Sequence, residues 1–455
     1  MISNFLVSSI RWDITNKCNL SCSHCYTKTN GHNELNYTQI LQILEKLIPF
    51  GLKEVNFSGR EPTLRDDLVN IIKWCRGEGL VVNVTTNGTK LYEKDFEHLL
   101  NTDVNLIVFS LDGAHADSND KIRGKGGFSK TVCNIRHCTK YIKKNNLNSK
   151  IGVSFTLQKI NAVECSEIIN LGDNLNIDLL VINPISFCGS AIDKRSLLYL
   201  SSEEILYCWE KICKTFKEKS PKYELFLGTM PMEAKFLNAK YNVELPVIHP
   251  GCSAGKTLYI TPDGKALPCY MLPPISDIVL DLKKYLNYWD ILFEPQEKAI
   301  EKFEPFITFT REYSQKDNRN CRYCPDLEVC RRCPLIAISD LEAIYRCQLA
   351  RNLLSALRPN LNRNTAIEIK NYISWELNGN ILRITIHKNG YINEKKLELD
   401  SLIKDVWLEI RGRSSILDVE LRLKKRWKTM KESEIRNLLH EFIDYFWKEG
   451  IIALL

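Results

Sequence analysis

The first half of the chain alternates between short β-branched runs and longer amphipathic stretches, which restricts the possible fold more than any other feature. Six runs have the length of a strand, at residues 8–15, 53–59, 81–87, 105–111, 150–157 and 178–184. Helix-period segments such as 37–48 and 65–75 separate them. This pattern predicts βαβ units and a parallel sheet. Because six units are too few for a closed eight-stranded barrel, we expect an α/β fold with a partial (β/α)6 barrel.

Unusual residues follow these strands rather than precede them. A cysteine-rich loop comes after the first strand, "SGREP" after the second, "TTNG" after the third and "SLDG" after the fourth. The carboxyl ends of parallel strands meet at one edge of a sheet, where ligands bind. One face is therefore expected to carry thiols, a carboxylate and several glycines.

The loop after the first strand contains Cys18, Cys22 and Cys25 at the spacing C-x3-C-x2-C. A cubane iron-sulfur cluster usually takes four thiolates, so three cysteines leave one iron able to bind a small molecule. Zinc is the alternative, but structural zinc sites prefer four ligands, and His24 is the only extra donor in this loop. The spacing favours a cluster over zinc.

Composition places the chain among globular proteins of about three domains, with 455 residues and 44% hydrophobic content. Neither a signal peptide nor an apolar run of membrane-spanning length is visible, so we expect a cytoplasmic protein without a membrane partner. In a reducing compartment, closely spaced members of its 17 cysteines are more often metal ligands than disulfides. The net charge of +7 is mild for this length, and no nucleic-acid partner is expected from it.

The cysteine motif and its surroundings resemble the radical SAM enzymes over residues 8–240. The resemblance implies that Cys18, Cys22 and Cys25 hold a [4Fe-4S] cluster whose open iron binds S-adenosylmethionine (SAM). Reductive cleavage of SAM would then give a 5′-deoxyadenosyl radical that abstracts hydrogen from a substrate. It also implies an external one-electron reductant such as flavodoxin or ferredoxin.

The same resemblance nominates four SAM-binding residues. "SGREP" stands where the family has G-G-E-P, so Glu61 would bind the SAM amino group, although Arg60 replaces the second glycine. "SLDG" and "DKIRG" resemble the segments that contact the SAM carboxylate and ribose, which nominates Ser110, Asp112 and Arg123. A turn aspartate and a solvated arginine are the alternatives for the last two. No catalytic residue is assigned from the sequence.

A second cysteine group follows, and from its spacing zinc and iron-sulfur clusters are equally compatible. Downstream of a radical SAM domain it resembles the SPASM extension, which holds two auxiliary [4Fe-4S] clusters. The resemblance assigns Cys321, Cys324, Cys330 and Cys347 to an outer cluster, and Cys252, Cys269 and Cys333 to an inner one. Either a further cysteine such as Cys188 completes the inner cluster or one of its irons stays open.

The last part of the chain reads as strands at 371–377 and 381–390, followed by helices at 401–410, 416–427 and 431–450. This order suggests a winged-helix-like domain, which could bind DNA through the basic residues 422–431. It also resembles the PqqD-like domain, or RiPP recognition element, that captures the leader of a ribosomal precursor peptide by strand addition.

We therefore expect a radical SAM partial barrel at 1–240, a SPASM domain at 241–360 and a PqqD-like domain at 368–455. The predicted function is modification of a ribosomally synthesised precursor peptide, by a thioether or carbon-carbon cross-link. An open iron in the inner cluster could bind a peptide cysteine, which favours the thioether. The alternatives are an anaerobic sulfatase-maturating type of formylglycine-generating enzyme and a non-catalytic iron-sulfur regulator that binds DNA. "SGREP" and "SLDG" argue against the regulator, which needs no SAM pocket.

Overall fold

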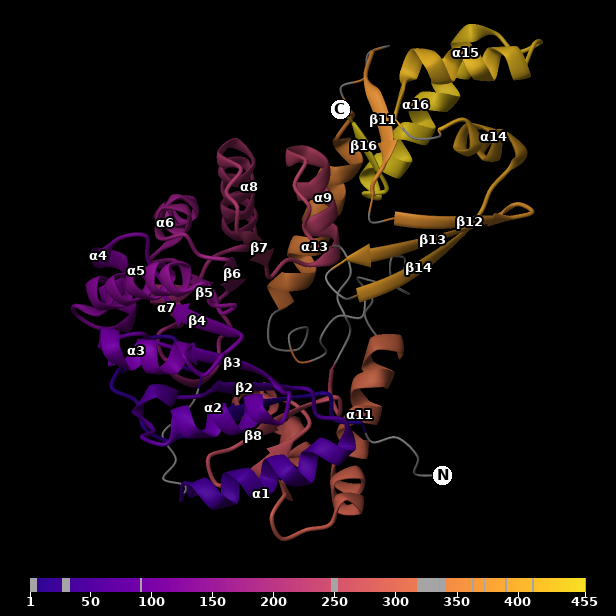
Figure 1. The fold of residues 1–455 in the computed structure, drawn as a ribbon. Coiled ribbons are helices and arrows are strands. Elements are labelled where there is room, and N and C mark those ends of the chain that lie inside the picture. Colours follow the sequence, from indigo (N-terminus) through magenta and orange to yellow (C-terminus); the bar gives the residue numbers. More distant parts are fainter. Residues whose placement is uncertain are drawn as a thin grey trace. The chain divides into compact units, whose positions relative to one another are not determined.

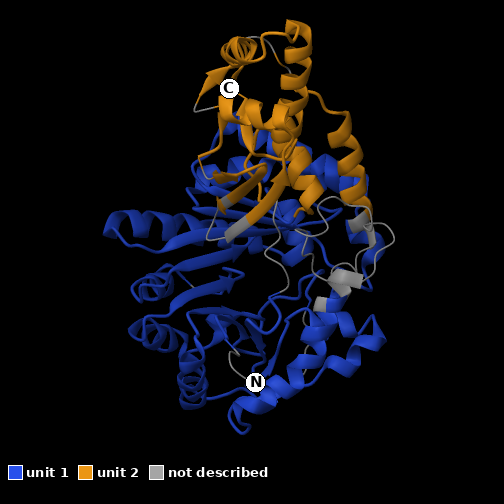
Figure 2. Cartoon of the chain, turned by 90° about the vertical axis from the view of Figure 1, so that its right-hand side faces the viewer, with its two compact units in different colours: residues 1–228, 251–344 blue, residues 229–250, 345–455 orange. Residues whose placement is uncertain are grey.

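The structure is a computed structural model of residues 1–455. It describes residues 6–26, 33–90, 92–246, 253–316, 335, 341–359, 361, 364–371, 373–388, 391–410 and 413–454. The chain forms two compact units (Figure 2), the first made of residues 1–228 and 251–344 and the second of 229–250 and 345–455.

A ten-stranded sheet in the order β10-β9-β8-β1-β2-β3-β4-β5-β6-β7 forms the centre of the first unit (Figure 1). Seven parallel strands make its main part: β1 Ser9–Asp13, β2 Glu54–Ser58, β3 Val81–Thr86, β4 Leu106–Ser110, β5 Lys150–Leu157, β6 Leu179–Pro184 and β7 Glu224–Leu227. On its other edge, β1 pairs in parallel with β8 (Thr257–Ile260). Two short antiparallel strands, β9 (Lys265–Leu267) and β10 (Trp289–Asp290), complete the sheet.

Helices connect the parallel strands and lie on the outer side of the sheet (Figure 1). They are α1 Tyr37–Leu47, α2 Leu68–Gly77, α3 Glu93–Leu100, α4 Ala116–Arg123, α5 Gly127–Asn145, α6 Glu167–Leu175, α7 Arg195–Leu198 and α8 Ser202–Lys219. The first unit also contains α10 Leu272–Ser276 and α11 Gln296–Lys316, which follow β9 and β10 respectively. None of the helices in the described ranges combines the length and hydropathy that a membrane crossing requires.

Local sequence explains where these elements begin and which faces they bury. Helix α1 starts at a capping box, in which Asn36 accepts from the Gln39 backbone and Gln39 accepts from the Asn36 backbone. Its apolar residues Ile40, Ile43, Leu44 and Leu47 recur at helical spacing and are all buried. In β4, buried residues alternate with half-exposed ones, which places Ile107 and Phe109 towards the helices and the intervening residues towards the concave side.

The six strands predicted from the sequence are all present, and the sheet extends beyond them. Strand β7 was not predicted, because its four residues "ELFL" lack the β-branched character of the other runs. The β8–β9 hairpin was not predicted either. Because it pairs with β1, the segment after residue 252 continues the sheet of the first unit rather than forming a separate layer.

The second unit begins with α9 (Pro231–Tyr241) and continues from residue 345, within helix α13 (Leu341–Ala356). Its remaining elements are β11 Ala366–Ile369, β12 Ile373–Asn378, β13 Ile381–Lys388, β14 Tyr391–Glu398, α14 Ser401–Glu409, β15 Ser414–Ser415, α15 Ile416–Arg426, α16 Glu432–Lys448 and β16 Ile452–Leu454. Strands β12, β13 and β14 form an antiparallel sheet, and β11 lies between β15 and β16 in another. The two strands and three helices predicted for this region are present, together with the unpredicted strands β11, β14, β15 and β16.

Aromatic packing builds the core of the second unit. The ring of Trp407 in α14 lies 4.9 Å from Phe446 and 5.7 Å from Trp375, between ring centroids. Phe442 packs against Phe446 at 4.4 Å. These residues come from α14, α16 and β12, and α15 contributes Ile416, Val419 and Leu423 to the same cluster, which therefore holds the three helices against the antiparallel sheet. The bounds of the two compact units do not coincide with those of the three domains predicted from the sequence. The three-domain division stays a prediction.

An ion-pair cluster ties α9 to the end of α16 within the second unit. Glu449 lies 2.9 Å from the ammonium of Lys235 and 2.6 Å from that of Lys395. Lys235 is only 4% exposed, and α9 also carries Glu233, which pairs with Arg346 at 3.1 Å. Burial alone would raise the pKa of Glu449, but the two lysines hold it below its usual value.

Glu449→Gln is expected to lower the free energy of unfolding by about 2–3 kcal/mol, because it removes the carboxylate that two lysines share, one of them buried. Since the pKa of Glu449 is lowered by folding, its contribution is complete above the ordinary carboxyl value of 4.5 and is lost as the pH falls below it. Urea unfolding at a series of pH values from 7 down to 3 measures this. The difference between the variant and the wild type should be constant above about pH 5 and should shrink progressively as the pH falls through the lower pKa of the folded state. A difference that does not change with pH would contradict the assignment.

Candidate functional site

The three-cysteine loop lies at the carboxyl end of β1 and is held in place by two other segments. The backbone of Ser23 donates to the carbonyl of Ile122 at 2.9 Å, and the backbone of Ser190 donates to the carbonyl of Cys25 at 2.8 Å. Within the loop, the Leu20 amide donates to the Cys18 sulfur at 3.4 Å. Backbone hydrogen bonds from α4 and from the segment after β6 therefore fix a loop without regular secondary structure.

Gly189, after β6, allows the closest of these contacts. Its φ of +56° is in the left-handed region, and a Cβ there would lie 2.4 Å from the Cys25 carbonyl oxygen. The neighbouring Cys188 is buried, and this burial raises the pKa of its thiol to about 11. Cys188 thus lies beside the first cysteine loop. Whether it also completes an auxiliary cluster, as the sequence suggested, is a separate prediction.

Cys18, Cys22 and Cys25 form a donor set compatible with an iron-sulfur cluster. All three are half-buried, and no disulfide joins any of the described cysteines. Burial, together with the nearby Asp112, Cys25 and Cys18, raises the pKa of Cys22 to about 11, and Arg123 opposes this rise. Within the described residues, no three His, Cys, Asp or Glu side chains converge on a single metal ion. A cubane cluster is compatible with this, because it binds each thiolate through a different iron.

A buried ion pair stands directly behind the cysteine loop. Arg123 Nε lies 2.6 Å from Asp112 Oδ2, and His24 Nε2 lies 3.4 Å from the same oxygen. The other carboxylate oxygen accepts from the backbone of Thr156 at 2.7 Å. Burial lowers the pKa of His24, so at neutral pH its ring is favoured in the uncharged form. The structure thus brings two nominated residues, Asp112 and Arg123, into contact with each other and with the loop.

Glu61 is completely buried and joins the ends of β2 and β3. Its carboxylate accepts from the amide and hydroxyl of Thr63, from the hydroxyl of Thr86 and from the amide of Asn87. Burial raises its pKa, although these hydrogen bonds oppose the shift. Glu61 therefore shapes the turn at this edge of the sheet. Its proposed contact with the SAM amino group stays a prediction.

Ser110, the fourth nominated residue, ends β4 in register with Ser154 of β5. It is half-exposed at the same carboxyl edge as Asp112, two residues further along. Cys269 is half-buried in the first unit, and Cys347 is half-buried on α13 in the second. The other nominated auxiliary ligands, Cys252, Cys321, Cys324, Cys330 and Cys333, lie outside the described residues.

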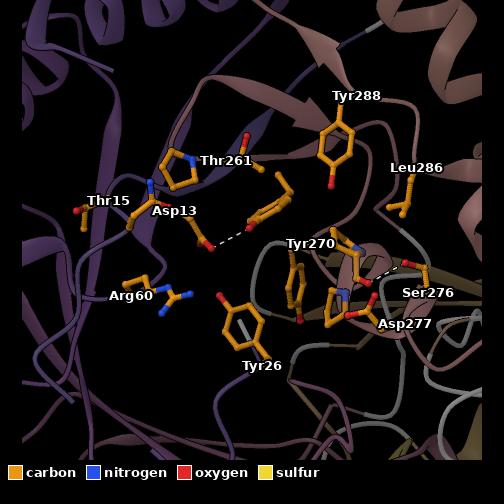
Figure 3. Close-up of a pocket in the computed structure, with 15 residues that line it drawn as sticks. Asp13, Thr15, Tyr26, Arg60, Thr261, Tyr270, Ser276, Asp277, Leu286 and Tyr288 are labelled. Carbon is orange, nitrogen blue, oxygen red and sulfur yellow. Dashed lines mark hydrogen bonds between the residues drawn. The ribbon is translucent and has the colours of Figure 1, made fainter. Parts of the chain in front are cut away.

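Two charged residues on β1, the half-buried Arg11 and the buried Asp13, were not predicted from the sequence. Arg11 and Asp13 are two residues apart on β1 and therefore lie on the same side of the sheet, and Asp13 lines a pocket of about 270 Å³ (Figure 3). Arg11 donates to the Ser58 hydroxyl and to the Tyr26 hydroxyl, both at 3.2 Å. Asp13 accepts from the Tyr259 hydroxyl at 2.8 Å. Charged residues at two positions of the same strand, two residues apart, are a signal in the sequence that could have identified the side of the sheet that carries the pocket.

Gly59 in "SGREP" allows β2 to approach Asp13. Its φ is +100°, and a Cβ would lie 2.7 Å from the backbone and side chain of Asp13. Gly59→Ala is expected to lower the free energy of unfolding by about 3 kcal/mol or more, from the backbone conformation and the clash together. Gly79→Ala is the matched control, since Gly79 has a φ of +76° with nothing within 4 Å. It should cost only about 1–2 kcal/mol. Equal losses in urea unfolding would refute the close approach.

The fold and this site together define an α/β protein whose parallel sheet carries a three-cysteine loop at its carboxyl edge. Residues 12–158 match the model of the Radical SAM superfamily. This segment is therefore a radical SAM domain, a family that uses SAM and a [4Fe-4S] cluster.

Curated relatives include two kinds of enzyme. The chain is 30% identical to Fe-coproporphyrin III synthase of Methanosarcina barkeri, over 39% of this chain and 44% of that protein. It is 29% identical to mycofactocin maturase MftC of Mycolicibacterium smegmatis, over 34% of this chain and 39% of the maturase. The chain thus spans less than half the length of these relatives.

Among solved structures, SuiB of Streptococcus suis bound to its precursor peptide SuiA is similar, with a TM-score of 0.58 and 16% identity over 75% of this chain and 76% of SuiB. At this identity the likeness concerns the fold, and it covers more of the chain than the radical SAM segment alone.

Proposed function

We propose that this protein is a radical SAM enzyme that modifies a ribosomally synthesised precursor peptide by a thioether or carbon-carbon cross-link. The observation that carries the proposal is the combination, in one chain, of a three-cysteine loop at the edge of a parallel sheet with a second unit that presents a separate antiparallel sheet. A mycofactocin maturase among the relatives and a peptide-bound SuiB among the similar folds support it.

In this proposal the chain's own residues position the reactants. Cys18, Cys22 and Cys25 would hold the cluster, and the cofactor pair would supply the radical that abstracts hydrogen. Asp112, paired with Arg123, would hold the cysteine loop in place through His24. Asp112, Arg123, Glu61 and Ser110 would together bind SAM. The half-buried positions of the three cysteines suit a cluster that needs both shielding and an approach for its reductant.

The second unit supplies the proposed peptide-recognition element. Strands β12 and β14 are the two edges of the antiparallel sheet, with helices α14, α15 and α16 following them in sequence. An exposed sheet edge can accept an extended peptide as an additional strand, since its backbone groups have no partner strand. We propose that the leader of the precursor peptide binds there, as in PqqD-like domains.

The two auxiliary clusters remain part of the proposal. Cys269 in the first unit and Cys347 in the second are compatible with ligand roles because both are half-buried and neither is in a disulfide. Three clusters would give about twelve irons per chain. Iron analysis of the reconstituted protein tests this number directly.

A porphyrin substrate is a second candidate, because Fe-coproporphyrin III synthase is among the relatives. The sulfatase-maturating type remains an alternative, and neither function requires a leader-binding unit. The discriminating experiment incubates anaerobically reconstituted enzyme, SAM and reductant with small peptides encoded by neighbouring genes, and separately with a tetrapyrrole precursor of Fe-coproporphyrin III and with a sulfatase peptide. A mass change in a precursor peptide supports the proposal, and turnover of only one of the other substrates refutes it.

A further inference from the structure

A polar pocket in the first unit lies between two segments that are nominated to bind clusters. Tyr26 directly follows Cys25, Tyr270 directly follows Cys269, and the two rings lie 6.5 Å apart in an edge-to-face arrangement. Figure 3 shows Asp13 and Arg60 facing these tyrosines from the sheet, with Tyr288 on the far wall. A group bound here would be next to the cysteine loop.

Asp13 has an unused hydrogen-bonding position in this pocket. The residue is only 3% exposed, and its Oδ2 accepts from Tyr259. Its Oδ1 is buried and has no hydrogen-bond partner in the described part of the chain. A buried carboxylate oxygen without a donor is costly, so such a group calls for a ligand that completes its hydrogen bonding.

The charges around Asp13 indicate what kind of donor fits. Arg11 is held behind it by Ser58 and Tyr26, and its guanidinium lies 4.2 Å from the centre of the Tyr270 ring. Arg60 lies on the pocket wall. Burial raises the pKa of Asp13, and Arg11, Arg60 and the hydroxyls of Tyr259 and Ser58 oppose this rise. The two guanidiniums near this carboxylate would repel an additional cation, and the free carboxylate oxygen would repel an anion. An uncharged donor such as a hydroxyl or carboxamide fits best.

The size of the pocket limits the ligand further. About 270 Å³ is enough for one amino-acid side chain but not for a tetrapyrrole. Tyrosine rings form much of the wall, which suits the flat faces of an amide or aromatic group.

We propose that this pocket receives the reacting residue of the peptide, and that this residue has an uncharged, hydrogen-bond-donating side chain that donates to Asp13 Oδ1. The proposal rests on the peptide-modifying function above, which it deepens by naming the class of side chain. In this role Asp13 is a substrate-binding residue that orients the side chain beside the cysteine loop.

The test uses three capped residues of nearly equal shape, the N-acetyl methylamides of asparagine, leucine and aspartate, with the SAM-loaded holoenzyme. Calorimetry or ligand-observed NMR should show the asparagine probe binding about tenfold or more tightly than the other two, as expected for a hydrogen bond to a charged acceptor. Equal binding of the asparagine and leucine probes by the wild type would overturn the proposal without any variant.

Asp13→Asn sharpens the test, because its amide can still accept from Tyr259 while presenting an NH₂ donor to the pocket. This variant should lose the preference for the asparagine probe and gain affinity for the aspartate probe. Asp103→Asn is the control, since Asp103 is a 59% exposed partner of Arg76. Unchanged probe preference in Asp13→Asn would refute the role of Asp13. Peptide turnover is measured separately, so a wild type that shows the probe preference but modifies no peptide would contradict only the proposed function.

Discussion

Replacing Cys18, Cys22 and Cys25 together with alanine is expected to abolish formation of 5′-deoxyadenosine and to remove about a third of the bound iron. These are the thiols of the loop at the carboxyl end of β1, and the buried Cys188 lies beside that loop. In the proposed assignment these thiols are the ligands of the catalytic cluster, so reductive cleavage of SAM would not start without them. Iron analysis, EPR of the reduced protein and chromatographic detection of 5′-deoxyadenosine measure both effects.

Cys133→Ala provides the matched control, because Cys133 is exposed on α5, on the outer side of the sheet. It should retain all of its iron and its SAM cleavage. Cys188→Ala tests whether Cys188 has a packing role or a ligand role. Because Cys188 is buried next to Gly189, the variant should have a lower free energy of unfolding and should keep its full iron content. SAM cleavage by the triple variant would disprove the assignment of the catalytic cluster.

Removing the leader from the precursor peptide is expected to lower kcat/KM for its modification by about a hundredfold or more, while SAM cleavage without peptide stays unchanged. A leader that adds to a sheet edge forms several backbone hydrogen bonds with the sheet, each worth about 1 kcal/mol. Losing all of these hydrogen bonds together accounts for a drop in kcat/KM of about a hundredfold. Because the leader would bind the second unit and the chemistry occurs in the first, the two activities should separate. Turnover of full-length and leaderless peptides by the intact enzyme measures this.

A deletion of residues 368–455 gives the complementary experiment, but it needs a folding control. It removes α16 and Glu449, the partner of the buried Lys235 on α9, and leaves the apolar face of α9 uncovered. Excess free leader added to the intact enzyme avoids this difficulty and should inhibit turnover competitively. Equal turnover of the full-length and leaderless peptides would contradict leader recognition by this unit.

Local sequence determined a large part of the first unit. Strand-length β-branched runs predicted β1 to β6, because the preference of β-branched residues for extended backbone can be read from the run itself. The prediction of a cluster loop from the spacing of Cys18, Cys22 and Cys25 is local in the same way, since all three lie within eight consecutive residues, and it stays a prediction. The helix periods and capping boxes of α1 and α8 are equally local.

Only the tertiary structure brought the pocket around Asp13 together. Tyr259, which donates to Asp13, is 246 residues away in sequence and reaches it because β8 pairs in parallel with β1. Arg60 looked like a departure from a glycine motif, yet in the fold its side chain lies on the pocket wall, where β2 passes Asp13. Likewise, Glu61 was nominated for a ligand, whereas the fold surrounds it with donors from the ends of β2 and β3. Such contacts depend on which strands lie next to each other in the sheet. The strand order depends on how the whole sheet buries its apolar surface, and no local run of residues determines it.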